Sequence, residues 1–192
     1  AKVNAAGGGD MDDDDDDADN SGDLEGGEAD LSDFDISDEE SSGAEGEAEV
    51  EVFSVDFDVE DGDVEVDRIE IVASSSTSSL EDNPWDFFDV VYVWDADGNE
   101  LASMDVDERD AWDDVDVTGS ADQHNLVLNG LDFVVREDDQ AEMTVGFDIA
   151  SNIDTADLAQ DFDFSIAEDG IRARDSEGID HYIPSSESST VD

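Results

Sequence analysis

The residues that could act in catalysis are few in type, because the chain has no cysteine and only two histidines, His124 and His181. Thiol catalysis, disulfides and thiolate metal sites are therefore excluded. Neither histidine lies near a Gly-x-Ser-x-Gly nucleophile elbow, and we expect both to be surface or edge residues. Paired carboxylates, as in glycosidases, carry no information, because 61 of the 192 residues are Asp or Glu. No motif indicates a reaction, and we expect that the chain is not an enzyme.

Calcium or another hard cation is the one cofactor that this composition suggests, since such ions bind several carboxylate and carbonyl oxygens. Asp95, Asp97 and Asn99 alternate around a predicted turn that would present their oxygens together. The EF-hand register is absent, because Gly98 is the fourth position of this segment and not the sixth. A plain hairpin turn is the alternative, and we place it first. The run Asp12 to Asp17 is expected to gather cations diffusely.

Aromatic side chains on a β-sandwich can stack on sugars, as they do in carbohydrate-binding modules. Trp85 follows Pro84 in a predicted loop and Trp112 lies among aspartates, so these two tryptophans are the candidates for sugar binding. Tyr92 and Trp94 share a phase on the most apolar predicted strand, and we expect them in the core. Core or subunit-contact roles are the alternative for all four aromatic residues, and we place that alternative first.

The net charge indicates the environment of the protein. The formal charge is −55, from 61 acidic and six basic residues, and Lys2 is the only lysine. Residues 50–192 hold 41 of the acids against five arginines, so the acids are not confined to a tail. In molar salt the Debye length falls to about 3 Å, which screens the repulsion within such a body. The composition resembles that of proteins from extreme halophiles. A polyanion without a basic patch is not expected to bind nucleic acid.

Composition divides the chain into three regions. Residues 1–47 are rich in Gly, Asp, Glu and Ser and are expected to form an acidic, low-complexity arm that is disordered by itself. Residues 48–184 are expected to form one domain, and residues 185–192 a polar tail. No run of about 20 apolar residues exists, so we expect no membrane span. The first residue is Ala1, for which we favour cleavage of a secretory signal over removal of an initiator Met.

From Ala48 onward, apolar and polar residues alternate as they do in half-buried strands. The clearest run is Ala141 to Ile149, with an apolar residue at every second position. A change of phase at Asp67 and Arg68 predicts a bulge, and a second slip is predicted at residues 129–130. About nine such strands, separated by turns and without a long helix, predict an all-β fold, namely an antiparallel β-sandwich.

The order of these runs carries a resemblance to a known family. An alternating pair (52–59 and 64–72) precedes the hairpin VVYVWDADGNEL (90–101), and the runs LVLNGLDFVV (126–135) and AEDGIRARDSEG (167–178) follow. The stretch from Phe53 to Ile183 thus resembles immunoglobulin-like β-sandwiches of bacterial and archaeal surface proteins, including subunits of extracellular filaments. The resemblance implies an immunoglobulin-like sandwich and a structural role, and it carries over no functional residue.

We therefore expect a self-assembling, extracellular filament or surface-layer subunit of a halophile, with copies of itself as partners. Donor-strand exchange would join the copies, because a sandwich has open strand edges. Phe34 and Ile36 alternate with polar residues in the arm and are the expected donor-strand residues, with residues 50–59 as second choice. That Phe34 and Ile36 dock on their own domain is the open alternative. A carbohydrate- or cell-surface-binding module is the second function, and a halophilic virus capsid or spike protein the third.

Overall fold

The computed structural model describes residues 24–39, 42–75, 83–115, 123–153 and 161–186. Over these ranges the chain forms ten strands, two short 3-10 helices and no α-helix. The strands make two five-stranded sheets in which every pairing is antiparallel. The expected all-β sandwich is confirmed. None of these ranges contains a helix long and apolar enough to cross a membrane.

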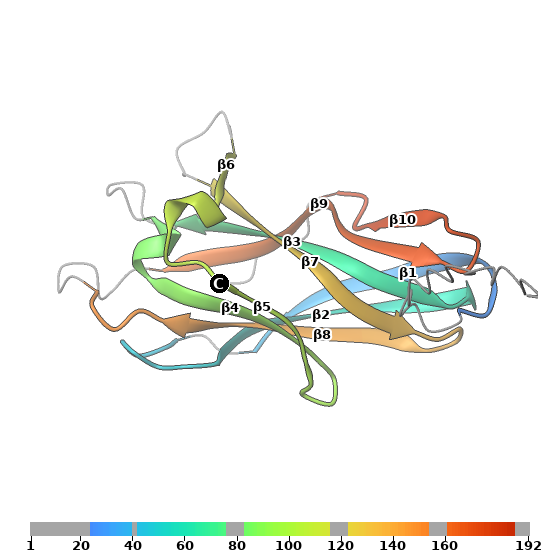
Figure 1. Cartoon of the computed structure of the whole chain (residues 1–192), viewed down its shortest axis with the longest axis horizontal. Helices are drawn as coiled ribbons and strands as arrows, with labels where there is room; N and C mark the ends of the chain where they lie inside the picture. The colour runs from blue at the N-terminus through green and yellow to red at the C-terminus, as the bar shows by residue number, and fades with distance from the viewer. Residues whose placement is uncertain (1–23, 40–41, 76–82, 116–122, 154–160, 187–192) are drawn as a thin grey trace, which may run out of the picture.

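The two sheets form two layers along the long axis of the molecule (Figure 1). The first sheet has the order β1 (Gly26–Asp38), β2 (Val50–Gly62), β8 (Gln140–Ile149), β4 (Phe88–Asp95), β5 (Glu100–Asp105). The second has the order β10 (Asp180–Ile183), β9 (Phe162–Asp175), β3 (Val64–Ser75), β7 (Gln123–Val135), β6 (Asp113–Val115). The 3-10 helices η1 (Pro84–Asp86) and η2 (Arg109–Ala111) flank β4 and β5 in the sequence. The edge strands are therefore β1, β5, β10 and β6.

The core lies between the two sheets and is built from the alternating runs. In β8 the alternate residues Ala141, Met143, Val145 and Phe147 are buried, because successive side chains of a strand point to opposite faces. Phe147 stacks on Phe164 of the second sheet, with ring centroids 5.1 Å apart. Such aromatic contacts across the two layers add to the free energy gained from burial of apolar area.

Both predicted phase slips are present as irregularities of register. The β3 pairings shift between Val66 and Arg68, which lets Val66 and Ile69 both face the core although they are three residues apart. In β7 the same spacing separates the buried Leu128 and Leu131, and Gly130 between them has a φ of 74°. A glycine tolerates this positive φ at little cost.

Strand β1 corrects the expected boundary between arm and domain. Residues 26–38 belong to the expected arm, 1–47, yet they form the edge strand of the first sheet, paired with β2. The alternation in this segment is interrupted, because Leu31 and Phe34 are three residues apart. A register shift between Ser32 and Asp35, with a φ of 50° at Asp33, brings both side chains to the core side. The sandwich thus begins at Gly26.

Candidate assembly surface

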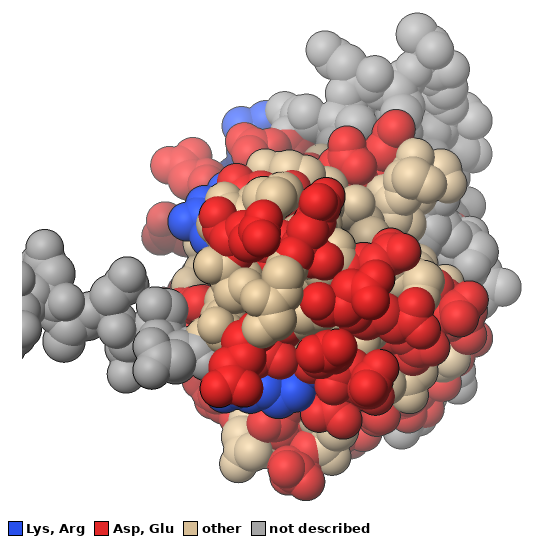
Figure 2. All heavy atoms as spheres, turned by 90° about the vertical axis from the view of Figure 1, so that its right-hand side faces the viewer, with Lys and Arg blue, Asp and Glu red and all other residues tan. Residues whose placement is uncertain are grey.

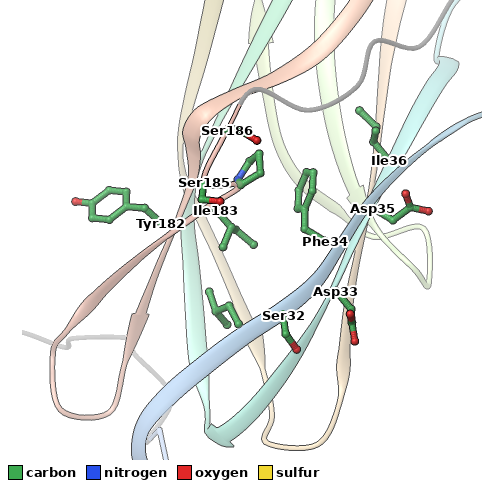
Figure 3. Close-up of a pocket in the computed structure, with 11 residues that line it drawn as sticks. Ser32, Asp33, Phe34, Asp35, Ile36, Tyr182, Ile183, Ser185 and Ser186 are labelled. Carbon is green, nitrogen blue, oxygen red and sulfur yellow. The ribbon is translucent and has the colours of Figure 1, made fainter.

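Strands β1 and β10 are neighbouring edges of the two sheets, and a groove of about 530 Å³ runs between them. Residues 31–36 of β1 and residues 182–186 in and after β10 line this groove. Phe34 and Ile183 point toward one another across it, whereas the Tyr182 ring is directed away from Phe34 (Figure 3). The predicted donor residues Phe34 and Ile36 are half-buried and pack against the core of their own domain. In this structure, Phe34 and Ile36 therefore dock on their own domain, which is the open alternative for these residues.

Carboxylates on the outer face of the first sheet oppose one another across β1, β2 and β8. Asp35 is the register partner of Asp56, which in turn is the register partner of Glu142. Burial raises the pKa of Asp56, and the charges of Asp35 and Glu142 raise this pKa further. Gln140 Nε2 donates a hydrogen bond of 2.9 Å to Asp56 Oδ1. Like charges directly opposite destabilise a strand pair, so the β1–β2 ladder is weakened where charge is unscreened.

A buried carboxylate, Asp63, fastens the start of β1 to the domain. The backbone N–H groups of Glu25 and Glu137 donate hydrogen bonds of 2.8 and 2.9 Å to Asp63, and Arg136 forms an ion pair with it. The Glu25 hydrogen bond is the largest influence on the pKa of Asp63, and it outweighs burial with the help of Glu137 and Arg136. The pKa of Asp63 therefore lies below its ordinary value.

A second buried carboxylate, Asp175, joins the β9–β10 hairpin to β1. Its Oδ1 accepts hydrogen bonds of 2.9 Å from the backbone N–H groups of Glu177 and Ile179. Its Oδ2 lies 2.8 Å from His181 Nε2 and accepts a longer bond, 3.4 Å, from the Ala29 N–H. Burial alone would raise the pKa of Asp175, but these hydrogen bonds outweigh burial and hold the pKa below its ordinary value. The first half of β1 thus depends on two carboxylates of the domain.

The proposed cation ligands Asp95, Asp97 and Asn99 form a self-contained turn between β4 and β5. Asp95 Oδ1 accepts hydrogen bonds of 2.9 and 2.8 Å from the N–H groups of Asp97 and Asn99. Asn99 Nδ2 donates a bond of 2.8 Å to Asp95 Oδ2, so the Asp95 carboxylate is used within the turn. The pKa of Asp95 is lowered chiefly by this Asn99 side-chain bond. Among the described residues, no group of three or more His, Asp or Glu is placed to hold a metal ion.

The turn after β9 repeats this arrangement and supports its structural role. Asp175 accepts from the N–H groups two and four residues later, as Asp95 does. Gly98 and Gly178 each occupy the fourth position with a φ of 78°, and each donates its N–H to the carbonyl of the first residue. Two turns with the same Asp-x-x-Gly spacing therefore close two hairpins. These hydrogen bonds support the plain hairpin turn that we place first, and a cation site at Asp95, Asp97 and Asn99 stays a prediction.

The tryptophans proposed for sugar binding do not form an exposed platform. Trp112 is only 3% exposed, and its Nε1 donates a hydrogen bond of 2.9 Å to the Val106 carbonyl. Trp85 is half-buried and meets His124 edge to face, at 5.1 Å between ring centroids. These contacts favour the packing roles that we place first for both tryptophans. The spacing of tryptophans along a sequence does not tell whether a later loop covers them.

Three further side-chain expectations have different outcomes. Tyr92 and Trp94 lie on the outer face of β4, stacked on each other at 5.2 Å, while Val91 and Val93 enter the core. The expected core position of Tyr92 and Trp94 is therefore wrong, because both faces of this strand are apolar. His181 does lie on an edge strand, whereas His124 is buried in β7.

Sequence reasoning missed the two carboxylates that fasten β1. Asp63 ends the segment Asp61-Gly62-Asp63 between two predicted strands, and this position by itself indicates only a turn residue. Asp175 opens an Asp-x-x-Gly turn, and the repetition of this spacing at Asp95 was the available signal. Neither signal could reveal the contacts with Glu25 and Ala29, which lie 38 and 146 residues away.

The chain matches no family model and no curated protein sequence. It is similar to a solved structure entitled "AvmM Catalyzes Macrocyclization in Alchivemycin A Biosynthesis". The similarity covers 82% of this chain and 84% of that chain, at 13% identity and a TM-score of 0.46.

The expectation that the chain is not an enzyme is corrected by this comparison. That expectation rested on the lack of a sequence motif that indicates a reaction. AvmM is described as a catalyst, and the expectation is therefore not carried into the proposal below. At this identity and TM-score, the similarity assigns no reaction, substrate or active-site residue to the chain.

Proposed function

We propose that the chain is a self-assembling structural subunit of an extracellular filament or surface layer in a halophile, joined by exchange of strand β1. The observation that carries the proposal is the place of β1, which is an edge strand bordering an open groove. The extracellular location is part of the proposal and is supported by the resemblance to prokaryotic surface proteins. The halophilic origin is supported by a net charge of −55.

Exchange of β1 requires only that the same contacts form between two copies instead of within one. The partners of β1 are β2 on its one paired side, the core contacts of Phe34 and Ile36, and the carboxylates Asp63 and Asp175. All of these partners belong to the rest of the domain, which a neighbouring copy also presents. Exchange of identical elements is a route to assembly that needs no new interface. A heterologous exchange, each copy donating to the next, would produce a filament.

The absence of cysteine allows a direct test with an engineered disulfide. Ser37 on β1 and Ser54 on β2 are register partners, and opposite residues in an antiparallel pair have Cα separations that suit a disulfide. The Ser37→Cys/Ser54→Cys variant is assembled in molar NaCl, oxidised and run on a denaturing gel without reductant. Exchange predicts covalent dimers and longer ladders. A monomer band from polymers verified by electron microscopy overturns the exchange.

A matched control uses register partners that cannot exchange with β1. Val72 and Ser165 pair between β3 and β9 inside the second sheet, so the Val72→Cys/Ser165→Cys variant is expected to give a monomer band under all conditions. A wild-type chain that remains monomeric in molar salt at high concentration contradicts the assembly proposal itself.

The sugar- or surface-binding module stays the second candidate function. The groove is the candidate site for a sugar, because it is lined by the aromatic ring of Phe34 and by the hydroxyls of Ser185 and Ser186 (Figure 3). Binding of glycans by a chain that stays monomeric would favour this candidate over the first.

A further inference from the structure

Half of the basic residues of this chain come together on the second sheet. The sequence has six Lys and Arg in total. Arg68 of β3 is the register partner of Arg172 of β9, and Arg174 follows two positions later on β9, opposite Glu65. Three of so few basic residues would not be expected to lie together by chance. Arg68 lies beside Arg172 and Arg174 because β3 pairs with β9, about 100 residues later in the chain.

Each of these arginines is paired with a carboxylate, so each ion pair is neutral as a unit. Arg172 binds Asp67 through two hydrogen bonds, Nε to Oδ1 at 2.8 Å and Nη2 to Oδ2 at 2.7 Å. Arg174 Nε lies 2.8 Å from Asp180 Oδ1. Arg68 Nη2 lies 3.2 Å from Glu70 Oε2. Bidentate and grouped pairs of this kind are the strongest surface ion pairs.

The surroundings of this cluster are strongly negative. Figure 2 shows one end of the molecule, where Asp and Glu cover most of the described surface and Lys and Arg are few. Two bodies with this charge repel each other over most orientations. The repulsion is weakest where positive and negative groups lie side by side, as Arg172 does with Asp67 and Arg174 with Asp180.

One exposed aromatic side chain, Tyr182, occurs at the same place. Among the described residues, the large hydrophobic side chains that are exposed are Ile179, at 39%, and Tyr182, at 45%. Ile179 immediately precedes β10, and Tyr182 lies on β10 opposite Arg172, while Asp180 lies opposite Arg174. Opposite residues of paired strands share one face of the sheet, so Tyr182 extends the row of Arg68 and Arg172. Its ring points away from the groove and from Phe34 (Figure 3).

We propose that this arginine face, formed by Arg68, Arg172, Arg174 and Tyr182 with their paired carboxylates, is a contact between two copies of the chain. A second, equally acidic copy is repelled less at this face than elsewhere, because arginines neutralise its paired carboxylates. The exposed Tyr182 ring gives that copy apolar area to bury. The face is also self-complementary. In a two-fold arrangement Asp180 of one copy would meet Arg174 of the other, and the Tyr182 ring would cover a guanidinium. Nucleic acid is disfavoured as the occupant, because every arginine of the face already has a carboxylate partner.

The inference rests on the proposed function in one respect, namely that the chain associates with itself. It is independent of strand exchange, because no residue of β1 belongs to the arginine face. A two-fold contact on this face and an exchanged β1 would together give each subunit two distinct connections.

Sedimentation velocity of the full chain in molar KCl, over a series of concentrations, tests the face. The Tyr182→Asp variant places a negative charge and no aromatic ring at its centre. We expect its dissociation constant for the dimer to rise at least tenfold. The control Ser103→Asp adds the same charge on the exposed side of β5, a distant edge strand, and is expected to dimerise as the wild type does. Circular dichroism in the same salt verifies that both variants fold.

The possible results separate this inference from the strand-exchange proposal. Equal dimerisation of the Tyr182→Asp and Ser103→Asp variants overturns the arginine face. Dimers that are lost in Tyr182→Asp but give no interchain Ser37–Ser54 link support the face and overturn strand exchange. Loss of dimers in Tyr182→Asp, with the interchain link retained in the polymer, supports both.

Discussion

Asp63 and Asp56 are carboxylates seven residues apart with opposite effects on stability. Asp63 is 4% exposed and accepts two backbone N–H bonds as well as the Arg136 ion pair, so its ionised form is favoured. Asp56 is half-buried and also faces Asp35 and Glu142, so its ionised form is disfavoured. Asp63 therefore stabilises the fold at neutral pH, whereas Asp56 does not. The difference comes from the surroundings of the two carboxylates, since both are aspartates.

Substitution of Asp63 tests the fastening of β1. Asp63→Ala leaves two backbone N–H groups and Arg136 without their acceptor, and we expect a loss of about 3 kcal/mol in the free energy of unfolding. Because the pKa of Asp63 is lowered in the folded state, its contribution is complete above the ordinary Asp pKa of about 3.9 and is lost as the pH falls below that value. Urea unfolding in molar salt should therefore separate wild type and variant at pH 7, and bring them together at low pH. An unchanged difference at low pH would mean that packing, not charge, is responsible.

Substitution of Asp56 should have the opposite sign. Asp56→Asn removes a like charge from the row with Asp35 and Glu142, and we expect a gain of about 0.2–1 kcal/mol for each relieved pair in dilute buffer. The gain should vanish in molar salt through screening, and also as the pH falls through the raised pKa of Asp56, where the wild type becomes protonated. Thermal melts of both proteins at two salt concentrations measure this. A gain that is equal at both concentrations would contradict the electrostatic explanation.

Strand β1 depends on the rest of the domain more than the rest depends on it. It pairs on one side only, with two irregularities of register, and it holds one fully buried apolar residue, Ala29, beside three half-buried ones. Strands β2 and β8, by contrast, are paired on both sides and hold the large core aromatic residues. An edge strand of this kind leaves β2 open when it departs.

Removal of β1 tests this dependence. A chain that lacks residues 1–39 should remain rich in β-structure in molar salt, yet melt at a lower temperature, because Asp63 and the core side of β2 lose their partners. Addition of a synthetic peptide of residues 24–39 should restore the melting temperature by binding to β2. A Phe34→Asp/Ile36→Asp peptide is the control and should not restore it. Restoration by the control peptide would show that the apolar face of β1 contributes nothing.

The whole molecule combines an ordinary apolar core with an extraordinary charge. The core residues of the two sheets are buried, as in any sandwich, and residues 50–192 hold 41 acids against five arginines. Its stability is therefore a balance between burial, which depends little on salt, and repulsion, which depends on it strongly.

Dilution of salt should shift this balance. Transfer from molar KCl or NaCl to about 0.1 M extends the Debye length from about 3 Å to about 10 Å, so that rows such as Asp35–Asp56–Glu142 repel unscreened. We expect polymers to dissociate first and the fold to loosen next, beginning with β1. Circular dichroism and light scattering during dialysis follow both steps. Unchanged spectra and particle size in dilute buffer would contradict the halophilic interpretation.

The sequence by itself determined the sandwich, the buried face of most strands and the positions of two bulges. These features follow from period-two alternation and its interruptions, which are local properties of the chain, as at Ala141 to Ile149 and at Asp67. Tertiary structure alone decided that β1 joins the first sheet, because three apolar residues in a polar segment gain enough only against a core that already exists. It also decided which aspartates are buried, that Trp112 is covered, and that Arg68 lies opposite Arg172. Each of these features depends on pairing between segments that are distant in the sequence. The free energy of such pairing depends on both segments, so neither segment alone predicts it.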